Sequence, residues 1–410
     1  MRKTALLAAI AIGFAAAQAQ TVYFWKNNVA LAVEASAAGD MIYSAGGTQL
    51  MLIDSLMNVS DIDSITIGNA IAETSVGIQY SGSTATAVIP FALSRKVSVS
   101  IDGAYVSATS SAIDGDEVTY KLAGQSTDGA FTQTGQYKCT LSLEGLSLAS
   151  KQGAAIDISN GKRINVILAD GTENTLADFA NGTQKGCFHV KGHPEFSGGG
   201  TLNITGNAAH GIDTGEYLEV KSGTINILSA VKDGIHAGQY FKIKNGTVTV
   251  KDVKGDGIQA AVTKDAADEL NGQMLISGGK IDINIKADDS KALRSDSLMT
   301  ISGGDISINI NGNGTKGIAT DATLNIDQST GTTKINIVIN GGVYTDPDTQ
   351  EDSKTRGIKC DGDLNVLGGT LVIEATGKKA KTINLDGIAT RSKSATITLN
   401  DDFTFDKTVD

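Results

Sequence analysis

Three consecutive stretches of the chain repeat one pattern: GTLNITGNAAHGIDTGEYLEVKS (residues 200–222), GTINILSAVKDGIHAGQYFKIKN (223–245) and GTVTVKDVKGDGIQA (246–260). Each begins with a short segment in which apolar and polar residues alternate, and then reaches a glycine followed by a hydrophobic residue. Looser copies continue toward residue 400. Aligned on this Gly–hydrophobic step, the repeats place in register Gly211, Gly234, Gly257, Ala292, Gly317, Gly357 and Thr382.

The period of this repeat is about 23–25 residues, which is typical of a parallel β-helix. Leu202 and Ile204 alternate with Asn203, as expected for a strand with one buried and one exposed side. One repeat with two short strands cannot bury its apolar side alone, so successive coils must stack on one another. Leucine-rich repeats have a similar period, but their leucine spacing is missing here. The pattern therefore predicts an all-β fold made of stacked coils.

Two longer intervals between repeats indicate insertions. Residues 263–272 (TKDAADELNG) have a brief helical pattern, and residues 344–356 (YTDPDTQEDSKTR) read as an acidic, solvated loop. Insertions of this kind usually lie on one face of a coil stack, which is often the face that binds ligands.

Three segments divide the chain. Residues 1–19 read as a secretory signal peptide, with a basic start, an apolar run and a small-residue cleavage site, so we expect an exported protein. Residues 20–135 predict a small β-rich N-terminal module, and residues 136–410 predict the β-helix domain. No later stretch has the ~20 apolar residues that a membrane-spanning helix needs, so we expect no membrane span.

The composition narrows the classes of protein further. The chain has 48 glycines but only 3 prolines among 410 residues, as expected where many turns are needed and backbone N–H donors must stay available for ladders. Its formal net charge of −11 argues against nucleic acid as a partner. Three cysteines leave at least one thiol unpaired. Cys187 and Cys360 lie six coils apart in this register, too far for a disulfide.

Several stretches resemble one known family. Residues 153–178 (GAAIDISNGKRINVILADGTENTLAD), residues 187–212 (CFHVKGHPEFSGGGTLNITGNAAHGI) and the DGIHAGQYF and GDGIQA steps are similar to the carbohydrate-binding β-helix family of exported bacterial proteins. The similarity extends over residues 137–410. The resemblance implies a right-handed, pectate-lyase-like parallel β-helix that binds acidic polysaccharide such as polygalacturonate, with calcium bound to the helix and without established catalysis.

Stacked coils turn the repeat into columns of side chains about 4.8 Å apart. The residues immediately before and immediately after each Gly–hydrophobic step form two such columns. The N-terminal end of these columns is rich in Asp and His, and the C-terminal end is basic. Asp213, Asp233 and Asp256 offer hard oxygen ligands in adjacent coils, which suit Ca²⁺, although Asp-Gly is also ordinary turn chemistry. The residues that we expect to contact a polyanion are His236, Gln259, Lys291, Arg294, Lys316, Arg356 and Lys359, and the alternative is a solvated basic surface.

Aromatic residues and histidines add two further candidates. Tyr217 and Tyr240 fall in the same register one coil apart, where they would either stack on sugar rings or pack within turns. All four histidines lie within three consecutive coils, and they form either a metal or catalytic cluster or, as we favour, structural hydrogen bonds; they are His189, His193, His210 and His236.

Three hypotheses for function remain open from the sequence. The leading one is a non-catalytic protein of the cell exterior that binds polysaccharide, with an acidic polysaccharide and calcium as the expected ligands. The second is a polysaccharide lyase on the same fold, with calcium and Arg294 as the base. The third is a structural surface protein or adhesin, for which buried Ile/Val and outward Thr/Asn ladders would suffice. The oligomeric state stays open.

Overall fold

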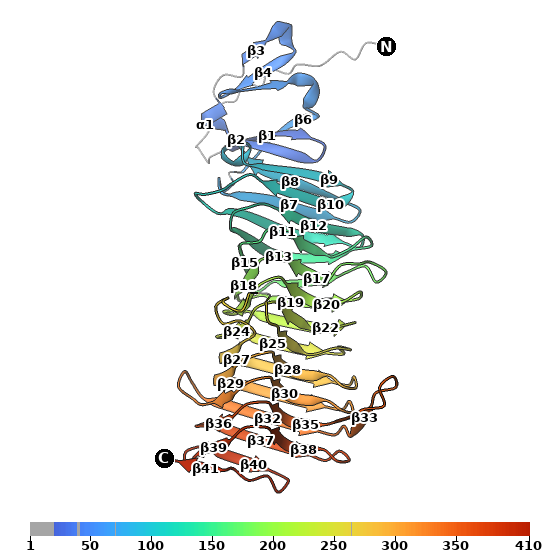
Figure 1. Ribbon diagram of the computed structural model, residues 1–410. Coiled ribbons are helices and arrows are strands. Elements are labelled where there is room, and N and C mark those ends of the chain that lie inside the picture. Colours follow the sequence, from blue (N-terminus) through green and yellow to red (C-terminus); the bar gives the residue numbers. More distant parts are fainter. Residues whose placement is uncertain (1–19, 39–41, 70, 264) are drawn as a thin grey trace.

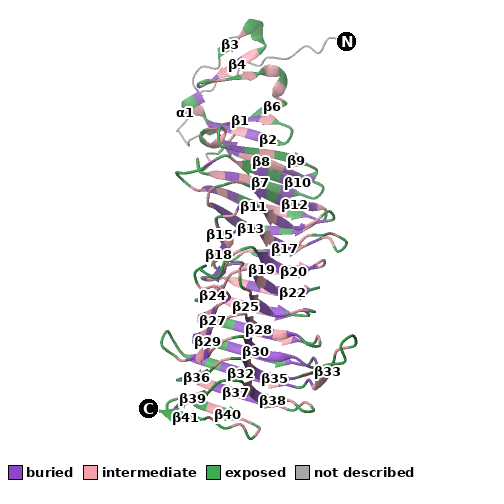
Figure 2. Ribbon diagram, in the orientation of Figure 1, coloured by how far each residue is buried: buried purple, intermediate pink, exposed green. Residues whose placement is uncertain are grey.

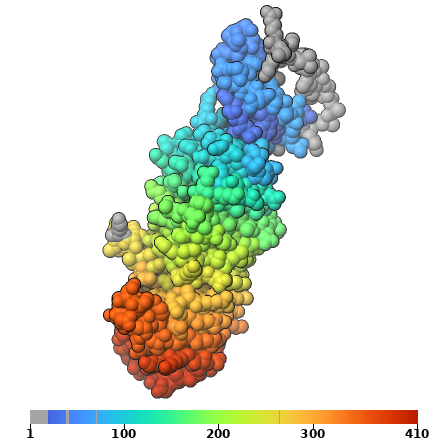
Figure 3. Space-filling view, turned by 90° about the vertical axis from the view of Figure 1, so that its right-hand side faces the viewer, coloured from blue at the N-terminus to red at the C-terminus, as the bar shows by residue number. Residues whose placement is uncertain are grey.

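The computed structural model describes residues 20–38, 42–69, 71–263 and 265–410. The predicted signal peptide lies outside these residues. The chain progresses in one direction along a long axis, and each coil stacks on the previous one (Figures 1 and 3). The all-β class predicted from the sequence is confirmed, because strands and their turns make up nearly all of the described chain. None of the described helices is long and apolar enough to cross a membrane.

Each coil has three sides, one more than the two strands per repeat that the sequence predicts. The coil of residues 210–230, for example, contains β20, β21 and β22, which pair in parallel with β23, β24 and β25 of the next coil. A short strand such as β21, with three residues between two turns, has little room for alternation, and its pattern is therefore hard to see in the sequence.

The first face is one parallel ladder along the axis, apart from the antiparallel pair that starts it. Its strands are β9 (Val97–Asp102), β10 (Ala104–Ser110), β12 (Gly129–Thr134), β14 (Ile156–Ile158), β17 (Gly186–Val190), β20 (His210–Thr214), β23 (Ile235–Ala237), β26 (Ile258–Ala260), β28 (Lys291–Ser295), β30 (Lys316–Thr320), β35 (Arg356–Cys360) and β38 (Lys381–Leu385).

The second face follows each first-face strand across a turn. Its strands are β11 (Val118–Ser126), β13 (Cys139–Ala149), β15 (Arg163–Leu168), β18 (His193–Gly198), β21 (Leu218–Val220), β24 (Phe241–Ile243), β27 (Met274–Ile285), β29 (Met299–Ile310), β31 (Leu324–Ile326), β36 (Leu364–Val366), β39 (Ala389–Ser392) and β41 (Lys407–Val409).

The third face closes the coil. It contains the C-terminal parts of β13, β27 and β29 together with β16 (Glu173–Ala177), β19 (Thr201–Gly206), β22 (Thr224–Ala230), β25 (Thr247–Lys251), β32 (Thr333–Ile339), β37 (Thr370–Ala375) and β40 (Thr396–Leu399).

The N-terminal region forms an antiparallel cap on the coil stack (Figure 1). Parallel pairing between coils begins upstream of residue 136, because β10 pairs in parallel with β12, and β7 with β11. The predicted boundary between residues 135 and 136 thus falls inside the run of parallel pairs. The elements before the first complete coil are β1 (Gln20–Lys26), β2 (Val29–Glu34), α1 (Ala35–Ala38), β3 (Ile42–Ser44), β4 (Gln49–Leu52), β5 (Ser55–Asn58), β6 (Ser64–Asn69), β7 (Ser75–Ser81) and β8 (Thr84–Pro90).

A continuous apolar core runs through the coils, while exposed residues collect at the loops and in the N-terminal cap (Figure 2). Leu202 pairs with Ile225, and Ile225 with Val248, and all three are fully buried. Each coil alone leaves one apolar row uncovered, so stacking supplies the burial that stabilises it. Cys187 and Cys360 are buried and free, as the register predicted.

The repeated glycines have two separate causes. Gly223 and Gly246 precede third-face strands and adopt φ of +88°, a left-handed conformation that favours glycine. Gly234, at the Gly–hydrophobic step, faces the next coil instead: a Cβ there would lie 2.6 Å from the carbonyl oxygen of Gly257. The glycine at the step is therefore required by close approach of the coils.

Both predicted insertions differ in structure from their sequence patterns. Residues 265–272 form turns and no helix. The acidic insertion contains an antiparallel hairpin of β33 (Val343–Thr345) and β34 (Asp352–Lys354). The first insertion follows a first-face strand and the second precedes one, so they lie at opposite edges of the first face.

Candidate functional site

The two columns predicted beside the Gly–hydrophobic step lie on the first face in the expected register. Asp213 pairs with His236, His236 with Gln259, and Gln259 with Arg294. The other column continues through Lys291, Lys316, Arg356 and Lys381. Alternation within each strand turns the residues after the step outward, as the burial of β23 and β26 illustrates.

Acidic and imidazole side chains alternate in the N-terminal part of the column of residues that follow the Gly–hydrophobic step. Nδ1 of His189 lies 2.9 Å from Oδ1 of Asp157, and its Nε2 lies 3.5 Å from Oδ2 of Asp213. Nδ1 of His236 in turn lies 3.0 Å from Oδ1 of Asp213. Asp213 therefore stands between two imidazoles, with a side chain that is only 7% exposed.

His210 joins this group from the neighbouring column. The rings of His210 and His236 are 4.9 Å apart between centroids, and Nδ1 of His210 lies 3.2 Å from Oδ2 of Asp233. Within the described residues, one nitrogen from each of these two imidazoles and an oxygen of Asp213 lie within 4.8 Å of one another. The sequence singled out all four histidines, but only the structure shows that His193 lies elsewhere, on the second face.

These contacts set the protonation of the group. Burial alone would raise the pKa of Asp213, but the hydrogen bond and charge of His236 hold it below its ordinary value. The hydrogen bond to Asp213 raises the pKa of His236. Asp256, in the next coil but one, differs because burial raises the pKa of its carboxyl. The three aspartates predicted to bind calcium thus have unlike environments.

The oxygens of these aspartates are already engaged in structural contacts. Oδ1 of Asp233 accepts the backbone N–H of Asp256 at 2.7 Å, and Oδ1 of Asp256 accepts that of Lys291 at 2.7 Å. Among the described residues Asp213 groups with imidazoles, and Ca²⁺ takes 6–8 oxygen ligands instead. The three aspartates do not fit a single calcium cage, and calcium binding remains a prediction without an assigned ligand set.

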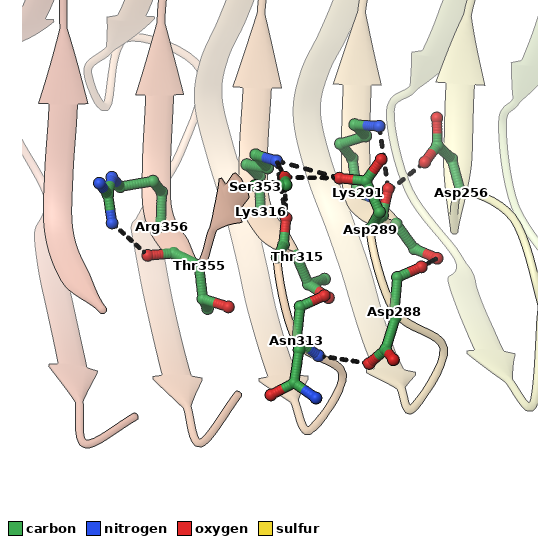
Figure 4. Close-up of polar contacts among 12 residues, drawn as sticks. Asp256, Asp288, Asp289, Lys291, Asn313, Thr315, Lys316, Ser353, Thr355 and Arg356 are labelled. Atoms are coloured by element: carbon green, nitrogen blue, oxygen red, sulfur yellow. Dashed lines mark hydrogen bonds and ion pairs between the residues drawn. The ribbon is translucent and has the colours of Figure 1, made fainter. Parts of the chain in front are cut away.

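The column of residues before the Gly–hydrophobic step is basic toward its C-terminal end, as predicted. Two of its cations, Lys316 and Arg356, are buried in the turns (Figure 4). Nζ of Lys316 donates to the carbonyl oxygen of Gly314 at 2.6 Å and to Oγ of Ser353 at 2.6 Å, and lies 3.3 Å from Oδ1 of Asp289. Ser353 belongs to β34, so this lysine fastens the acidic hairpin to the coils. Burial lowers the pKa of Lys316, and Asp289 offsets this only in part.

Arg356 is likewise buried and donates to backbone carbonyl oxygens. Its Nη1 donates to the carbonyl oxygens of Thr355 at 2.8 Å and Lys379 at 3.0 Å, and the residue is 8% exposed. Burial lowers the pKa of this guanidinium. Lys316 and Arg356 therefore bind backbone carbonyls of the protein itself.

Of the remaining predicted cations, Arg294 and Lys359 form ion pairs, and Lys291 bonds to the backbone. Arg294 lies 3.0 Å from Asp296 and 3.4 Å from Asp256, and the Nζ of Lys359 contacts Asp361. Nζ of Lys291 donates to the backbone oxygen of Asp289 at 3.0 Å. The first face is consequently less cationic than its column of lysines and arginines indicates.

Tyr217 and Tyr240 stack on each other rather than presenting two open faces. Their ring centroids are 4.5 Å apart with an angle of 8°, and His193 stacks on the other side of Tyr217 at 4.3 Å. The hydroxyl of Tyr217 donates to Glu195 at 2.8 Å. Both faces of Tyr217 are therefore covered, and only ring edges reach the surface.

An open cavity between the second and third faces was not predicted. It encloses about 480 Å³, and Lys244 and Lys334 lie at its edges. Its floor contains Gly278, Gly279 and Gly304, whose missing side chains leave the backbone accessible. The signal in the sequence is the repeated ISGG at residues 276–279 and 301–304, to which we assign no role from the sequence alone.

Lys334 is the more available of the two lysines. It is exposed and forms no ion pair with another residue that the structure describes, whereas Nζ of Lys244 lies 2.6 Å from Oε1 of Glu219. Ser277, Thr330 and Thr332 also line the cavity, and the hydroxyls of Ser277 and Thr330 donate to the backbone oxygens of Ile243 and Ser277. Asp305, the ladder partner of Lys334, also lines the cavity, so this arrangement of ammonium, carboxylate, hydroxyl and backbone groups suits a polar ligand.

Together, the coil stack and its open cavity form an elongated scaffold. A family model described as carbohydrate-binding domain-containing protein matches residues 102–395. The chain therefore belongs to this family, and the carbohydrate-binding resemblance seen in the sequence is confirmed. The matched range coincides with the stacked coils.

A solved structure supports the fold. The polysaccharide lyase-like protein from C. thermocellum, as a gadolinium derivative, aligns with a TM-score of 0.52 at 22% identity, covering 62% of this chain and 98% of that one. At this identity the similarity concerns the fold alone. Comparison with curated proteins gave no significant match.

Proposed function

We propose that this protein is a non-catalytic carbohydrate-binding protein of the cell exterior, and that its ligand is an extended acidic polysaccharide. The observation that carries the proposal is the family match over residues 102–395, which spans the stacked coils. Coils repeat outward positions about every 4.8 Å. A sugar polymer has a repeat of the same order, so successive sugars would meet equivalent groups. We further propose that the coils form a right-handed parallel β-helix of the pectate-lyase type.

The preferred contact surface is the cavity between the second and third faces. Lys334 offers an unpaired ammonium group to a uronate carboxylate, and the hydroxyls of Thr330 and Thr332 would serve sugar hydroxyls. Arg294 and Lys359 on the first face are a second, weaker surface, because both already contact aspartates. The signal-peptide pattern of residues 1–19 supports the proposed export.

Affinity gel electrophoresis tests the proposal. The full mature chain should be retarded by polygalacturonate and much less by neutral galactan. Lys334→Ala should reduce the retardation, whereas Lys378→Ala, which removes an exposed lysine outside the cavity, should not. Equal migration with and without polygalacturonate would remove the acidic ligand, and equal losses in the two variants would remove the cavity as its site.

Calcium is tested in the same gels. We propose that Ca²⁺ bridges uronate carboxylates to acidic groups of the protein, since carboxylate oxygens suit this ion. Retardation by polygalacturonate should then fall when EDTA replaces calcium. Unchanged retardation would show that the lysines bind the polysaccharide without calcium.

The lyase alternative lacks a suitable base at the predicted position. Burial alone would lower the pKa of Arg294, but the charges of Asp296 and Asp256 raise it above its ordinary value. A guanidinium held protonated cannot abstract the proton beside a uronate carboxylate. Release of unsaturated product, measured by ultraviolet absorbance, would nevertheless contradict the non-catalytic proposal. Failure to bind any glycan would favour the third hypothesis, a structural surface protein or adhesin.

A further inference from the structure

We propose that His210, Asp213 and His236 form a binding site for a divalent transition-metal ion of the Zn²⁺ type. This site shares Asp213 with the predicted all-oxygen calcium site and is separate from the glycan-binding cavity. The three side chains come from two adjacent first-face strands, β20 and β23. Ligand atoms from all three lie within 4.8 Å of one another.

The strand register explains why they meet. His210 and Asp213 flank the buried pair Gly211 and Ile212 on β20, and the ladder places His236 opposite Asp213. Parallel pairing fixes the backbone of both strands on either side of the site. The ligands are therefore held by the core and not by a loop, so that little ordering is needed on binding.

The distances require only small movements. Two ligand atoms on a tetrahedral zinc are about 3.3 Å apart, as follows from bond lengths near 2.0 Å. Nδ1 of His236 and Oδ1 of Asp213 are already 3.0 Å apart. Replacing the proton between them by a metal ion would therefore leave both side chains nearly in place, and a rotation of His210 would complete the set.

A supporting carboxylate is also present. Metal-binding histidines commonly direct their other ring nitrogen at a carboxylate, which orients the ring and strengthens the ligand. Nδ1 of His210 lies 3.2 Å from Oδ2 of Asp233 and also accepts the backbone N–H of Asp233 at 3.2 Å. Nε2 of His210 makes no hydrogen bond with any other residue of the described chain, so it is available as a ligand.

The donor chemistry selects the metal class. Two imidazoles and one carboxylate suit Zn²⁺ and related late first-row ions, whereas Ca²⁺ prefers oxygen alone. The side chain of Asp213 is 7% exposed and that of His236 is 27% exposed, so the site is sheltered but open to solvent on one side. Three protein ligands leave a coordination position for water.

Titration of the EDTA-treated full chain with Zn²⁺ alone, followed by calorimetry, tests the site without any glycan. We expect one ion per chain to bind at micromolar concentration. His236→Gln and His210→Gln should each weaken binding at least about tenfold, which is typical of losing a ligand contact. The matched control is His193→Gln, because His193 stacks on Tyr217 of the second face and should not matter.

Co²⁺ provides a readout that does not depend on the stability of a variant. The wild-type chain should develop visible absorption bands with one equivalent of Co²⁺, and Zn²⁺ but not millimolar Ca²⁺ should abolish them. Circular dichroism verifies that each variant is folded. The proposal is overturned by the absence of saturable Zn²⁺ binding, by displacement with Ca²⁺, or by an equal loss in His193→Gln. None of these results bears on glycan binding, which is measured separately.

Discussion

The coils of the first face divide into two runs that fill the same ladder positions with opposite chemistry. The histidine coils, from β17 to β26, place Asp and His side chains against one another on the outside of the face. The lysine coils, from β28 to β38, place Lys and Arg there instead. In the histidine coils the charged groups pair between coils, whereas in the lysine coils Lys316 and Arg356 turn into the coil and donate to backbone carbonyls.

The difference arises from side-chain length. Asp and His are short, so each reaches only the residue one coil away, about 4.8 Å along the axis. Lys and Arg are long enough to reach the turn that precedes their own strand, as Lys316 reaches Gly314. A column of charges in the sequence is thus not a column of charges on the surface. On the first face, His210, Asp213 and His236 of the histidine coils gather into one group, whereas Lys316 and Arg356 of the lysine coils stabilise the turns.

The largest effect that tests this contrast should come from Lys316→Met. The substitution leaves the carbonyl of Gly314 and the carboxylate of Asp289 without their cation, so the free energy of unfolding should fall by about 2–4 kcal/mol. Lys359→Met is the matched control, because its side chain is 41% exposed and should change stability by less than about 0.5 kcal/mol. Urea denaturation measures both. Equal midpoints for the two variants would refute a structural role for Lys316.

A smaller effect should come from the close approach of neighbouring coils at the step, which both runs share. In Gly234→Ala the new Cβ would lie 2.6 Å from the carbonyl oxygen of Gly257, which should cost about 1–3 kcal/mol. In the lysine coils Ala292 holds the equivalent position with a Cβ, whereas a Cβ at Gly317 would lie 2.5 Å from the carbonyl oxygen of Gly357. Gly331→Ala is the control, since no atom lies within 4 Å of a Cβ there. If thermal unfolding shows the same midpoint for both variants, close coil approach is not what selects glycine at the step.

The smallest effect concerns acid stability in the lysine coils. Burial alone would raise the pKa of Asp289, but Ser353, Lys291 and Lys316 hold it below its ordinary value. A carboxyl with a lowered folded-state pKa stabilises the protein above its unfolded pKa of about 3.9, and this contribution is lost as the pH falls through the folded value. The thermal midpoints of the wild type and Asp289→Asn should therefore differ at pH 5 and converge toward pH 2. A difference that stays constant over this range would contradict the prediction.

Much of the architecture could be predicted because stacking makes it periodic. The step positions from Gly211 to Thr382 appear in the sequence as a repeat, and the ladders confirm their register. The third strand of each coil was missed, because a three-residue strand between turns carries no alternation to detect. The hairpin of β33 and β34 was missed for a related reason, since its acidic sequence resembles that of a solvated loop.

The candidate sites were predictable only in part. The sequence brought His236 and Asp213 into neighbouring coils of one column, and the structure places them in contact. It also grouped Lys316 and Arg356 with the solvent-facing cations, although both are buried. The cavity near Lys334 depends on how the corners of several coils align, and no single repeat contains that information.

The sequence by itself determined which residues share a column, since a constant repeat length carries equivalent positions to equivalent places in every coil. The tertiary structure decided what each column does. Whether a charged side chain reaches solvent, a neighbouring coil or a backbone carbonyl depends on its length and on the turn beside it. Those distances exist only after the coils have stacked.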